Sequence, residues 1–275
     1  MICEMVNICS NIFFDPYLAI QPLYRYNGTE RKYCMYEFQS RVRYSETDTD
    51  AKLSLTGIMN YFQDCSTFQS EDCGVGLSYL EREKKAWLLS SWQIQILERP
   101  KLGDVIFIAT WPYEIKGIYG LRNFMILDAN RKYLVKANSC WFLFDTEKGK
   151  PVRVTRKDVD AYGAEEPKLS MEYAPRKILL PGEMKEMGRR SVLKHQIDTN
   201  HHVNNAQYVD IAREILPEGL EIGEIRAEYK KAAVLGDEMV VKAAETEAGY
   251  VVSLCGEDDS IFANVELTEK KRAEA

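Results

Sequence analysis

Alternating apolar and polar positions dominate the chain from Met35 to about Arg153. Tyr36 to Tyr44 alternates in this way, and four further runs are separated by turn-forming residues, a pattern typical of β-strands. These runs are Trp87 to Leu97, Asp104 to Pro112, Leu121 to Leu127 and Tyr133 to Phe144. The pattern therefore predicts five strands joined mostly by short turns.

One segment between the first two predicted strands has helical spacing instead. Apolar side chains recur at this spacing from Leu53 to Cys73, and Ser54 or Thr56 can cap the start of the helix. A single helix followed by long strands with short turns predicts an antiparallel sheet wrapped around that helix. This is the hotdog arrangement, an α+β fold.

Two short strings recur later in the same order. Asp48-Thr49-Asp50 is echoed by Asp198-Thr199-Asn200, and Leu102-Gly103-Asp104 is echoed by Leu235-Gly236-Asp237. Each copy of the first string precedes a helical stretch, which in the second copy is Asn205 to Ile215. Because echoes in matching order and context indicate an internal repeat, we expect a second, shorter hotdog unit.

The repeat and a charged, proline-containing stretch divide the chain into four parts. We expect an N-terminal extension of doubtful order (1–34), a first hotdog domain (35–153), a linker (154–182) and a second hotdog domain (183–270). The prediction is a tandem hotdog, with two antiparallel sheets that each wrap around a central helix. Such a chain supplies both units itself and could be a monomer or a homodimer.

Composition excludes several classes of protein. A net charge of -6 argues against nucleic-acid binding, which needs a surplus of Lys and Arg on one face. No apolar run approaches the roughly 18 residues needed to span a bilayer. The seven cysteines are scattered without metal-binding spacing, so we expect free thiols in a reducing cytoplasm, and neither a metal nor a cofactor.

The three histidines of the chain lie within eight positions of one another, at 195, 201 and 202. Asp198, Asn200 and His202 alternate in what we interpret as an extended approach to a helix, so their side chains would line one wall. Cleavage of a thioester could use His202 as proton acceptor or donor, the Asn200 amide to polarise the carbonyl, and Asp198 to orient the imidazole or a water. These three are the predicted catalytic residues.

The string from Asp198 to Tyr208, read as Asp-x-Asn-x-His-Val-Asn-Asn-x-x-Tyr, resembles a motif of the acyl-acyl carrier protein thioesterases, the plant plastid enzymes and their bacterial relatives. Arg43-Tyr-Ser-Glu-Thr-Asp48 and Gly57-Ile-Met-Asn-Tyr-Phe-Gln-Asp64 in the first half are also similar to that family. The resemblance implies hydrolysis of fatty acyl thioesters on acyl carrier protein, which terminates fatty acid synthesis.

The same resemblance implies that the first hotdog unit holds the acyl chain. Lys52 stands where the second repeat has His202, so the first copy lacks an imidazole. Candidate substrate-binding residues comprise five apolar side chains, for each of which simple core packing is the competing interpretation, and two amides at the second helix start. They are Met59, Phe62, Trp87, Leu89, Trp92, Asn204 and Asn205.

One departure from the family keeps other functions open. Where plant members have a catalytic glutamate and cysteine after a Glu-Tyr-basic-basic string, this chain has Ala232 and Ala233. The alternatives are an acyl-CoA thioesterase, a catalytically weak acyl-thioester or carrier-protein binding module, and a hydratase or dehydratase on the same fold. The sequence leaves the preferred acyl chain length open.

Overall fold

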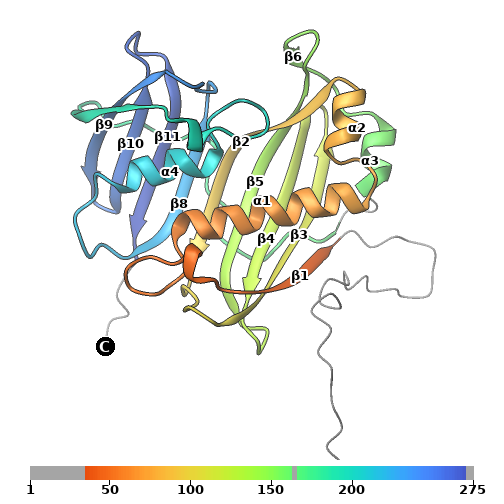
Figure 1. Cartoon of the computed structure of the whole chain (residues 1–275), viewed down its shortest axis with the longest axis horizontal. Helices are drawn as coiled ribbons and strands as arrows, with labels where there is room; N and C mark the ends of the chain where they lie inside the picture. Colours follow the sequence, from red (N-terminus) through yellow and green to blue (C-terminus); the bar gives the residue numbers. More distant parts are fainter. Residues whose placement is uncertain (1–34, 163–165, 271–275) are drawn as a thin grey trace, which may run out of the picture.

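The computed structural model describes residues 35–162 and 166–270, in which the strands form one antiparallel sheet of eleven (Figure 1). The strands are β1 (Tyr36–Arg41), β2 (Lys85–Ile96), β3 (Val105–Lys116), β4 (Tyr119–Leu127), β5 (Tyr133–Asp145), β6 (Lys150–Pro151), β7 (Lys185–Ser191), β8 (Ile222–Tyr229), β9 (Glu238–Thr246), β10 (Gly249–Cys255) and β11 (Ile261–Glu269). The helices are α1 (Leu55–Asp72), α2 (Leu77–Arg82), α3 (Arg156–Tyr162) and α4 (Asn205–Arg213). The predicted extension 1–34 lies outside the described residues.

The sheet runs without a break through both halves of the chain, in the order β1-β3-β4-β5-β2-β8-β11-β10-β9-β7, with β6 beside β5. The prediction of two sheets needs correction on this point. Strands β2 and β8 pair antiparallel, with Ser91 opposite Glu228 and Gln95 opposite Glu224, and this pairing joins the halves. Hydrogen bonding between the two central strands satisfies backbone groups that would otherwise form two exposed edges.

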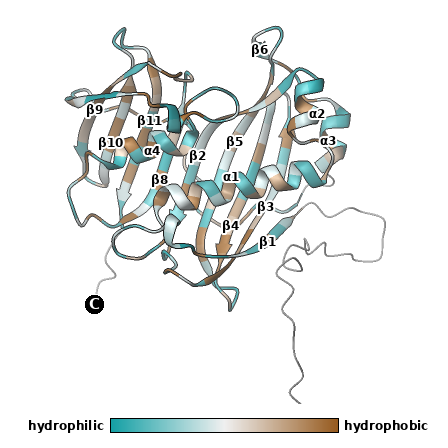
Figure 2. Ribbon diagram, in the orientation of Figure 1, coloured by the Kyte–Doolittle hydropathy of each residue, from teal (hydrophilic) through white to brown (hydrophobic). Residues whose placement is uncertain are grey.

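Helix α1 forms where the spacing predicted it and packs across the sheet. The Ser54 hydroxyl accepts a hydrogen bond from the Gly57 backbone N–H at 2.9 Å, which caps the first turn as expected. One face of the helix is buried, and there the ring of Phe62 packs against Trp92 and Phe124 at centroid distances of 5.8 and 5.1 Å. In Figure 2 the ribbon of α1 carries both hydrophobic (brown) and hydrophilic (teal) residues along its length, and the strands behind it carry hydrophobic residues.

Phe62 is completely buried in this cluster, whereas Phe68, two turns further along α1, is 43% exposed. Phe62→Ala is expected to lower the free energy of unfolding by about 3–5 kcal/mol, because it removes a large apolar side chain and leaves a cavity. Phe68→Ala is the matched control, with an expected loss of at most about 1 kcal/mol. Urea denaturation measures both, and equal losses would contradict the assignment of Phe62 to the core.

The internal repeat is reproduced in detail around the two echoed strings. In both halves a 3₁₀ turn leads into a tight loop, in which Asp48 N–H bonds to Lys52 O at 2.9 Å and Asp198 N–H bonds to His202 O at 2.8 Å. Gly103 and Gly236 occupy the left-handed region at φ +88° and +91°, a conformation that favours glycine. The second unit is shorter, since β8 has 8 residues where β2 has 12.

The segment predicted as a linker contains α3, and from residue 166 onward it crosses the face of the sheet opposite α1. There the Trp111 indole N–H donates to Pro167 O at 2.9 Å, and Leu169 N–H donates to the Asn123 side-chain oxygen at 3.0 Å. Buried polar groups on this outer face therefore find partners in the crossing segment. No helix in the described ranges is long and apolar enough to cross a membrane.

Candidate functional site

Asp198 to His202 form a tight turn and not the extended segment that the sequence suggested. An isolated bridge between Ile197 and Val203 closes the turn, and His201 has a left-handed φ of 61°. One carboxylate oxygen of Asp198, Oδ1, accepts hydrogen bonds from the backbone N–H groups of Asn200, at 2.8 Å, and His202, at 3.4 Å. A short polar side chain that bonds its own backbone in this way stabilises the turn.

The turn brings the predicted catalytic residues close together along the backbone but does not couple their side chains. Among the described residues, no hydrogen bond links the side chains of Asp198, Asn200 and His202. The second oxygen of Asp198, Oδ2, accepts no hydrogen bond from the described part of the chain. His195 and His201 are exposed, whereas His202 is half-buried. The site thus presents one free carboxylate oxygen, one amide and two adjacent imidazoles.

A cavity of about 740 Å³ lies beside this turn. Most of its wall comes from the first half of the chain, including Gln63 and Thr67 on α1, and Trp87 on β2. The remaining wall is the turn of the second half, which contributes Asp198, Thr199, Asn200 and His201. Two segments more than 100 positions apart in sequence therefore enclose one space.

Only Trp87 among the five apolar candidates lines this cavity. Met59, Phe62, Leu89 and Trp92 are at most 7% exposed, pack in the core and do not line this cavity. Neither predicted amide at the helix start lines it. The Asn204 side chain caps α4 by accepting from Ala206 N–H at 2.9 Å, and Asn205 O accepts from the Tyr229 hydroxyl at 2.9 Å.

Several residues that line the cavity were not singled out from the sequence. The polar ones lie at the end of α1 and on the strands below it, and α2 adds apolar side chains. Ser66 and Gln69 lie at core-facing helical spacing in the stretch from Leu53 to Cys73, and polar residues at such positions were the available signal. The missed lining residues include Ser66, Ser70, Leu77, Leu80, Arg122 and Tyr162.

Ala232 and Ala233 lie outside this wall. Ala232 is exposed, while Ala233 is fully buried, and its N–H donates to the Tyr208 hydroxyl at 2.9 Å. Burial raises the pKa of the Tyr208 phenol to about 12, so the hydroxyl stays protonated at neutral pH. Tyr208, the last residue of the motif, therefore links α4 by a hydrogen bond to the segment that follows β8.

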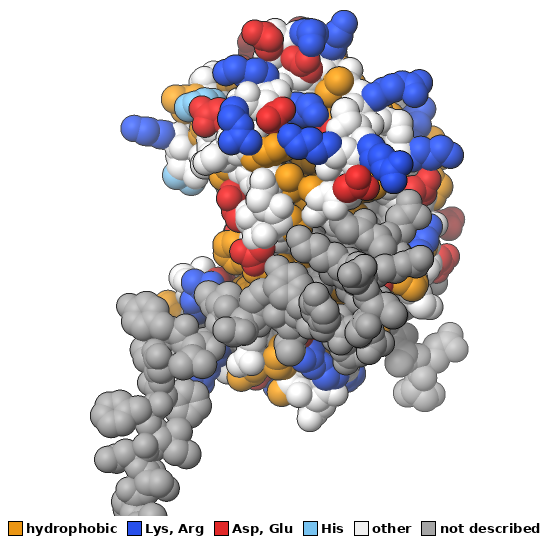
Figure 3. Space-filling model, turned by 90° about the vertical axis from the view of Figure 1, so that its right-hand side faces the viewer, with side chains coloured by type: hydrophobic (Ala, Val, Ile, Leu, Met, Phe, Trp, Pro, Cys, Tyr) orange, Lys and Arg blue, Asp and Glu red, His pale blue; other side chains and the backbone are white. Residues whose placement is uncertain are grey.

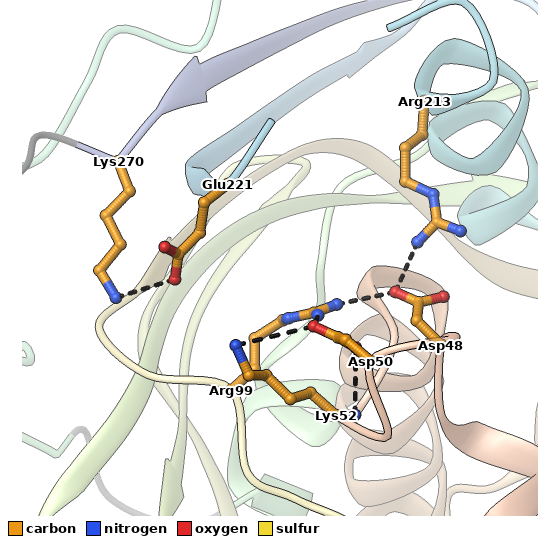
Figure 4. Close-up of polar contacts among 7 residues, drawn as sticks. All are labelled: Asp48, Asp50, Lys52, Arg99, Arg213, Glu221 and Lys270. Carbon is orange, nitrogen blue, oxygen red and sulfur yellow. Dashed lines mark hydrogen bonds and ion pairs between the residues drawn. The ribbon is translucent and has the colours of Figure 1, made fainter. Parts of the chain in front are cut away.

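The matching turn of the first half has a different role (Figure 4). The Asp48 carboxylate lies between two guanidinium groups, Arg99 at 2.7 Å and Arg213 of α4 at 2.8 Å, and Arg99 also pairs with Asp50. Arg213 thereby ties the second half to the first. A carboxylate held by two ion pairs is poorly placed to act as a base, and the imidazole is replaced by Lys52, which pairs with Asp50 at 3.6 Å.

Comparison with known proteins identifies the family. The family models for the acyl-ACP (acyl carrier protein) thioesterase N-terminal and C-terminal domains match residues 33–162 and 182–267. The chain belongs to the acyl-ACP thioesterase family. This confirms the resemblance seen in the motif around Asp198.

Curated members of the acyl-ACP thioesterase family are distant in sequence. A chloroplastic acyl-[acyl-carrier-protein] hydrolase of Cuphea viscosissima is 25% identical over 202 residues, which are 67% of this chain and 48% of that protein. A chloroplastic palmitoyl-acyl carrier protein thioesterase of Arabidopsis thaliana is 20% identical over 207 residues, 69% of this chain and 50% of that protein. The chain thus spans about half the length of the curated relatives it matches.

Solved structures of acyl-ACP thioesterases share the fold. The enzyme from Bacteroides thetaiotaomicron superimposes with a TM-score of 0.76 at 19% identity, covering 86% of this chain and 98% of that chain. The 12:0-ACP thioesterase from Umbellularia californica gives 0.77 at 15% identity, covering 87% and 98%. Within residues 35–162 and 166–270, no group of three or more His, Cys, Asp or Glu side chains is arranged to hold a metal ion.

Proposed function

We propose that this protein hydrolyses fatty acyl thioesters of acyl carrier protein to free fatty acid and carrier protein, terminating fatty acid synthesis. The observation that carries the proposal is the shared cavity. Asp198 and Asn200 of the second half lie on the wall of a space of about 740 Å³ that belongs mainly to the first half. A thioester carbonyl at the turn would thus have its acyl chain between α1 and the sheet.

In the proposed reaction a water molecule attacks the thioester carbonyl. His202 takes the proton of the water and returns it to the departing thiolate. The Asn200 NH2 group donates to the carbonyl oxygen as negative charge develops there. Asp198 uses Oδ1 to hold the turn and offers Oδ2 to the water or the imidazole. Because the family glutamate and cysteine are alanines here, the mechanism includes no cysteine nucleophile.

The roles of the two halves follow from this arrangement. The hotdog domain at 35–153 would bind the acyl chain, and the domain at 183–270 would supply the catalytic turn, with 154–182 connecting them. We propose a cytoplasmic location, since the described cysteines, at 65, 73, 140 and 255, are all free thiols.

Carrier protein is the favoured thiol partner over coenzyme A because of the charge near the cavity. Figure 3 shows Lys and Arg side chains, interspersed with Asp and Glu, over the end of the molecule formed by α2 and α3. Exposed cations there include Arg82, Lys84, Arg156 and Lys157, and Lys84 also lines the cavity. Arg82 pairs with Glu83 at 3.7 Å and Arg156 pairs with Asp160 at 3.6 Å, which leaves Lys84 and Lys157 as the cations of this basic surface that would attract an acidic carrier protein and raise its rate of association.

A hydrolysis panel tests the proposal. Acyl carrier protein and coenzyme A thioesters of matched chain lengths are compared by free thiol release at low and high salt. We expect kcat/KM to be about tenfold higher for the carrier-protein substrates at low salt, with the difference shrinking as salt screens the basic surface.

Other results would each point to one alternative. Equal rates with both thiols, or a preference for coenzyme A, would favour an acyl-CoA thioesterase. Binding of the thioester without thiol release would favour a binding module, for which the alanines at 232 and 233 are the supporting observation. Formation of an enoyl product from a hydroxyacyl thioester would favour a dehydratase.

A further inference from the structure

Arg122 is an unusual residue to find on the wall of a cavity for a fatty acyl chain. It lies on β4, is only 8% exposed, and lines the cavity of about 740 Å³. No carboxylate in the described part of the chain is within ion-pair distance of its guanidinium. A buried cation without a counter-ion is costly, because the protein interior solvates charge poorly.

The neighbours of Arg122 use only part of its hydrogen-bonding capacity. Its Nη1 donates to the Gln69 side-chain oxygen and to the Thr110 hydroxyl at 3.2 Å, which occupies the two hydrogens on that nitrogen. The guanidinium carbon lies 5.3 Å from the centre of the Tyr162 ring. A guanidinium has five N–H donors, so Nε and Nη2 retain three without an acceptor among the described residues.

The remaining N–H donors of Arg122, on Nε and Nη2, are not fully buried. Every fully buried side-chain nitrogen or oxygen of the described residues has a hydrogen-bond partner. Nε and Nη2 of Arg122, which lack one, must therefore reach open space, and the cavity is the space that Arg122 lines. The other cations on the wall are Lys84, at the exposed rim, and Lys85, which is paired with Asp158 at 3.1 Å.

Arg122 lies on the part of the cavity wall next to the end of α1. It bonds Gln69 near the end of α1, and the neighbouring Ser70 hydroxyl lies 3.0 Å from the Tyr162 hydroxyl. The beginning of α1 contacts α4, where the Thr56 hydroxyl donates to Asp210 at 3.1 Å. Thr56 and Gln69 are 13 residues apart, so this contact lies roughly 20 Å along α1 from the residue that Arg122 bonds. Gln63 to Ser70, the α1 residues on the wall, span roughly 10 Å along the helix.

We propose that this cavity selects acyl chains that carry a carboxylate at the end remote from the thioester, and that Arg122 is the specificity-determining residue that binds it. The three unused donors of Arg122 suit a carboxylate, which accepts a pair of N–H bonds from one guanidinium. The Ser66 and Ser70 hydroxyls nearby donate to backbone oxygens of α1. Because these hydroxyls carry no charge, they supply no anion that would compete with a substrate carboxylate for the guanidinium. The inference rests on the proposed function in that the cavity must hold the acyl chain.

The test compares two thioesters of equal chain length, one methyl-ended and one carboxyl-ended, on the same carrier protein. The wild-type protein is expected to favour the carboxyl-ended substrate by roughly 10- to 100-fold in kcat/KM, the range of a charge-assisted hydrogen bond. Arg122→Met should abolish this preference, and Arg122→Lys should retain part of it. Lys84→Met, which removes the rim cation, is the matched control and should leave the preference unchanged.

The outcomes separate this inference from the proposed function. A wild-type preference for the methyl-ended chain, equal rates, or a preference that survives Arg122→Met would overturn the role of Arg122 while leaving hydrolysis established. If neither thioester releases thiol, the proposed function fails, and calorimetric binding of dicarboxylic against monocarboxylic acids of equal length decides instead. If Arg122→Met does not fold, the wild-type ratio of the two substrates decides alone.

Discussion

His202→Ala is expected to lower kcat for acyl-ACP hydrolysis by about 10²- to 10⁴-fold, the usual contribution of a general acid or base. The imidazole is half-buried at the turn, and its backbone N–H and carbonyl are both held by Asp198. Its removal should therefore take away the proton acceptor without altering the turn. Single-turnover rates of thiol release measure the effect directly, with substrate binding followed separately.

His201→Ala is the matched control for this variant. His201 is the adjacent imidazole, it lines the cavity, and it is exposed. We expect less than about a fivefold change in kcat, because an exposed histidine at a left-handed position is replaced without loss of the proton acceptor. The reverse order of effects would transfer the acid-base role from His202 to His201.

Asp198→Asn is expected to lower kcat by at least about 10²-fold while leaving the melting temperature nearly unchanged. Asparagine keeps the side-chain oxygen that accepts from the backbone N–H groups of Asn200 and His202, so the turn should persist. The negative charge offered to the water or the imidazole is lost. Asp198→Ala should lose both activity and about 1 kcal/mol of stability, since it removes the turn bonds as well.

Asp48→Asn tests the same chemical change at the equivalent position of the first half. Asp48 pairs with Arg99 and Arg213, so the expected effect is a loss of stability with kcat within about threefold of the wild type. Melting curves and thiol-release rates of both asparagine variants separate the two roles. Full activity of Asp198→Asn would reduce Asp198 to a turn-forming residue.

The sequence predicted those parts of the fold that local periodicity encodes. The strands, helix α1 with its Ser54 cap, and the two echoed strings are all confirmed, because alternation, helical spacing and turn chemistry are properties of neighbouring residues. The pairing of β2 with β8 joins residues 129 to 137 positions apart, and no local pattern predicts it. Two sheets were therefore expected where there is one.

Of the three predicted catalytic residues, Asp198 and Asn200 line the cavity and His202 does not, and the segment that carries them differs in geometry from the prediction. Alternation in the string from Asp198 to His202 suggested an extended segment, yet the Asp198 side chain bonds the backbone and His201 adopts φ 61°, which together produce a turn. Of the five apolar candidates, only Trp87 lines the cavity. Core and cavity lining are both apolar in sequence, and only the packing separates Trp87 on the wall from Phe62 in the core.

The shared cavity has a consequence for how activity depends on dilution. A site assembled from two separate chains loses its walls when the protein concentration falls below the dissociation constant of the pair. Here the turn with Asp198 and the wall with Trp87 belong to one polypeptide and are joined by the pairing of β2 with β8. Covalent linkage fixes their effective concentration, so each molecule carries a complete cavity even when it is alone.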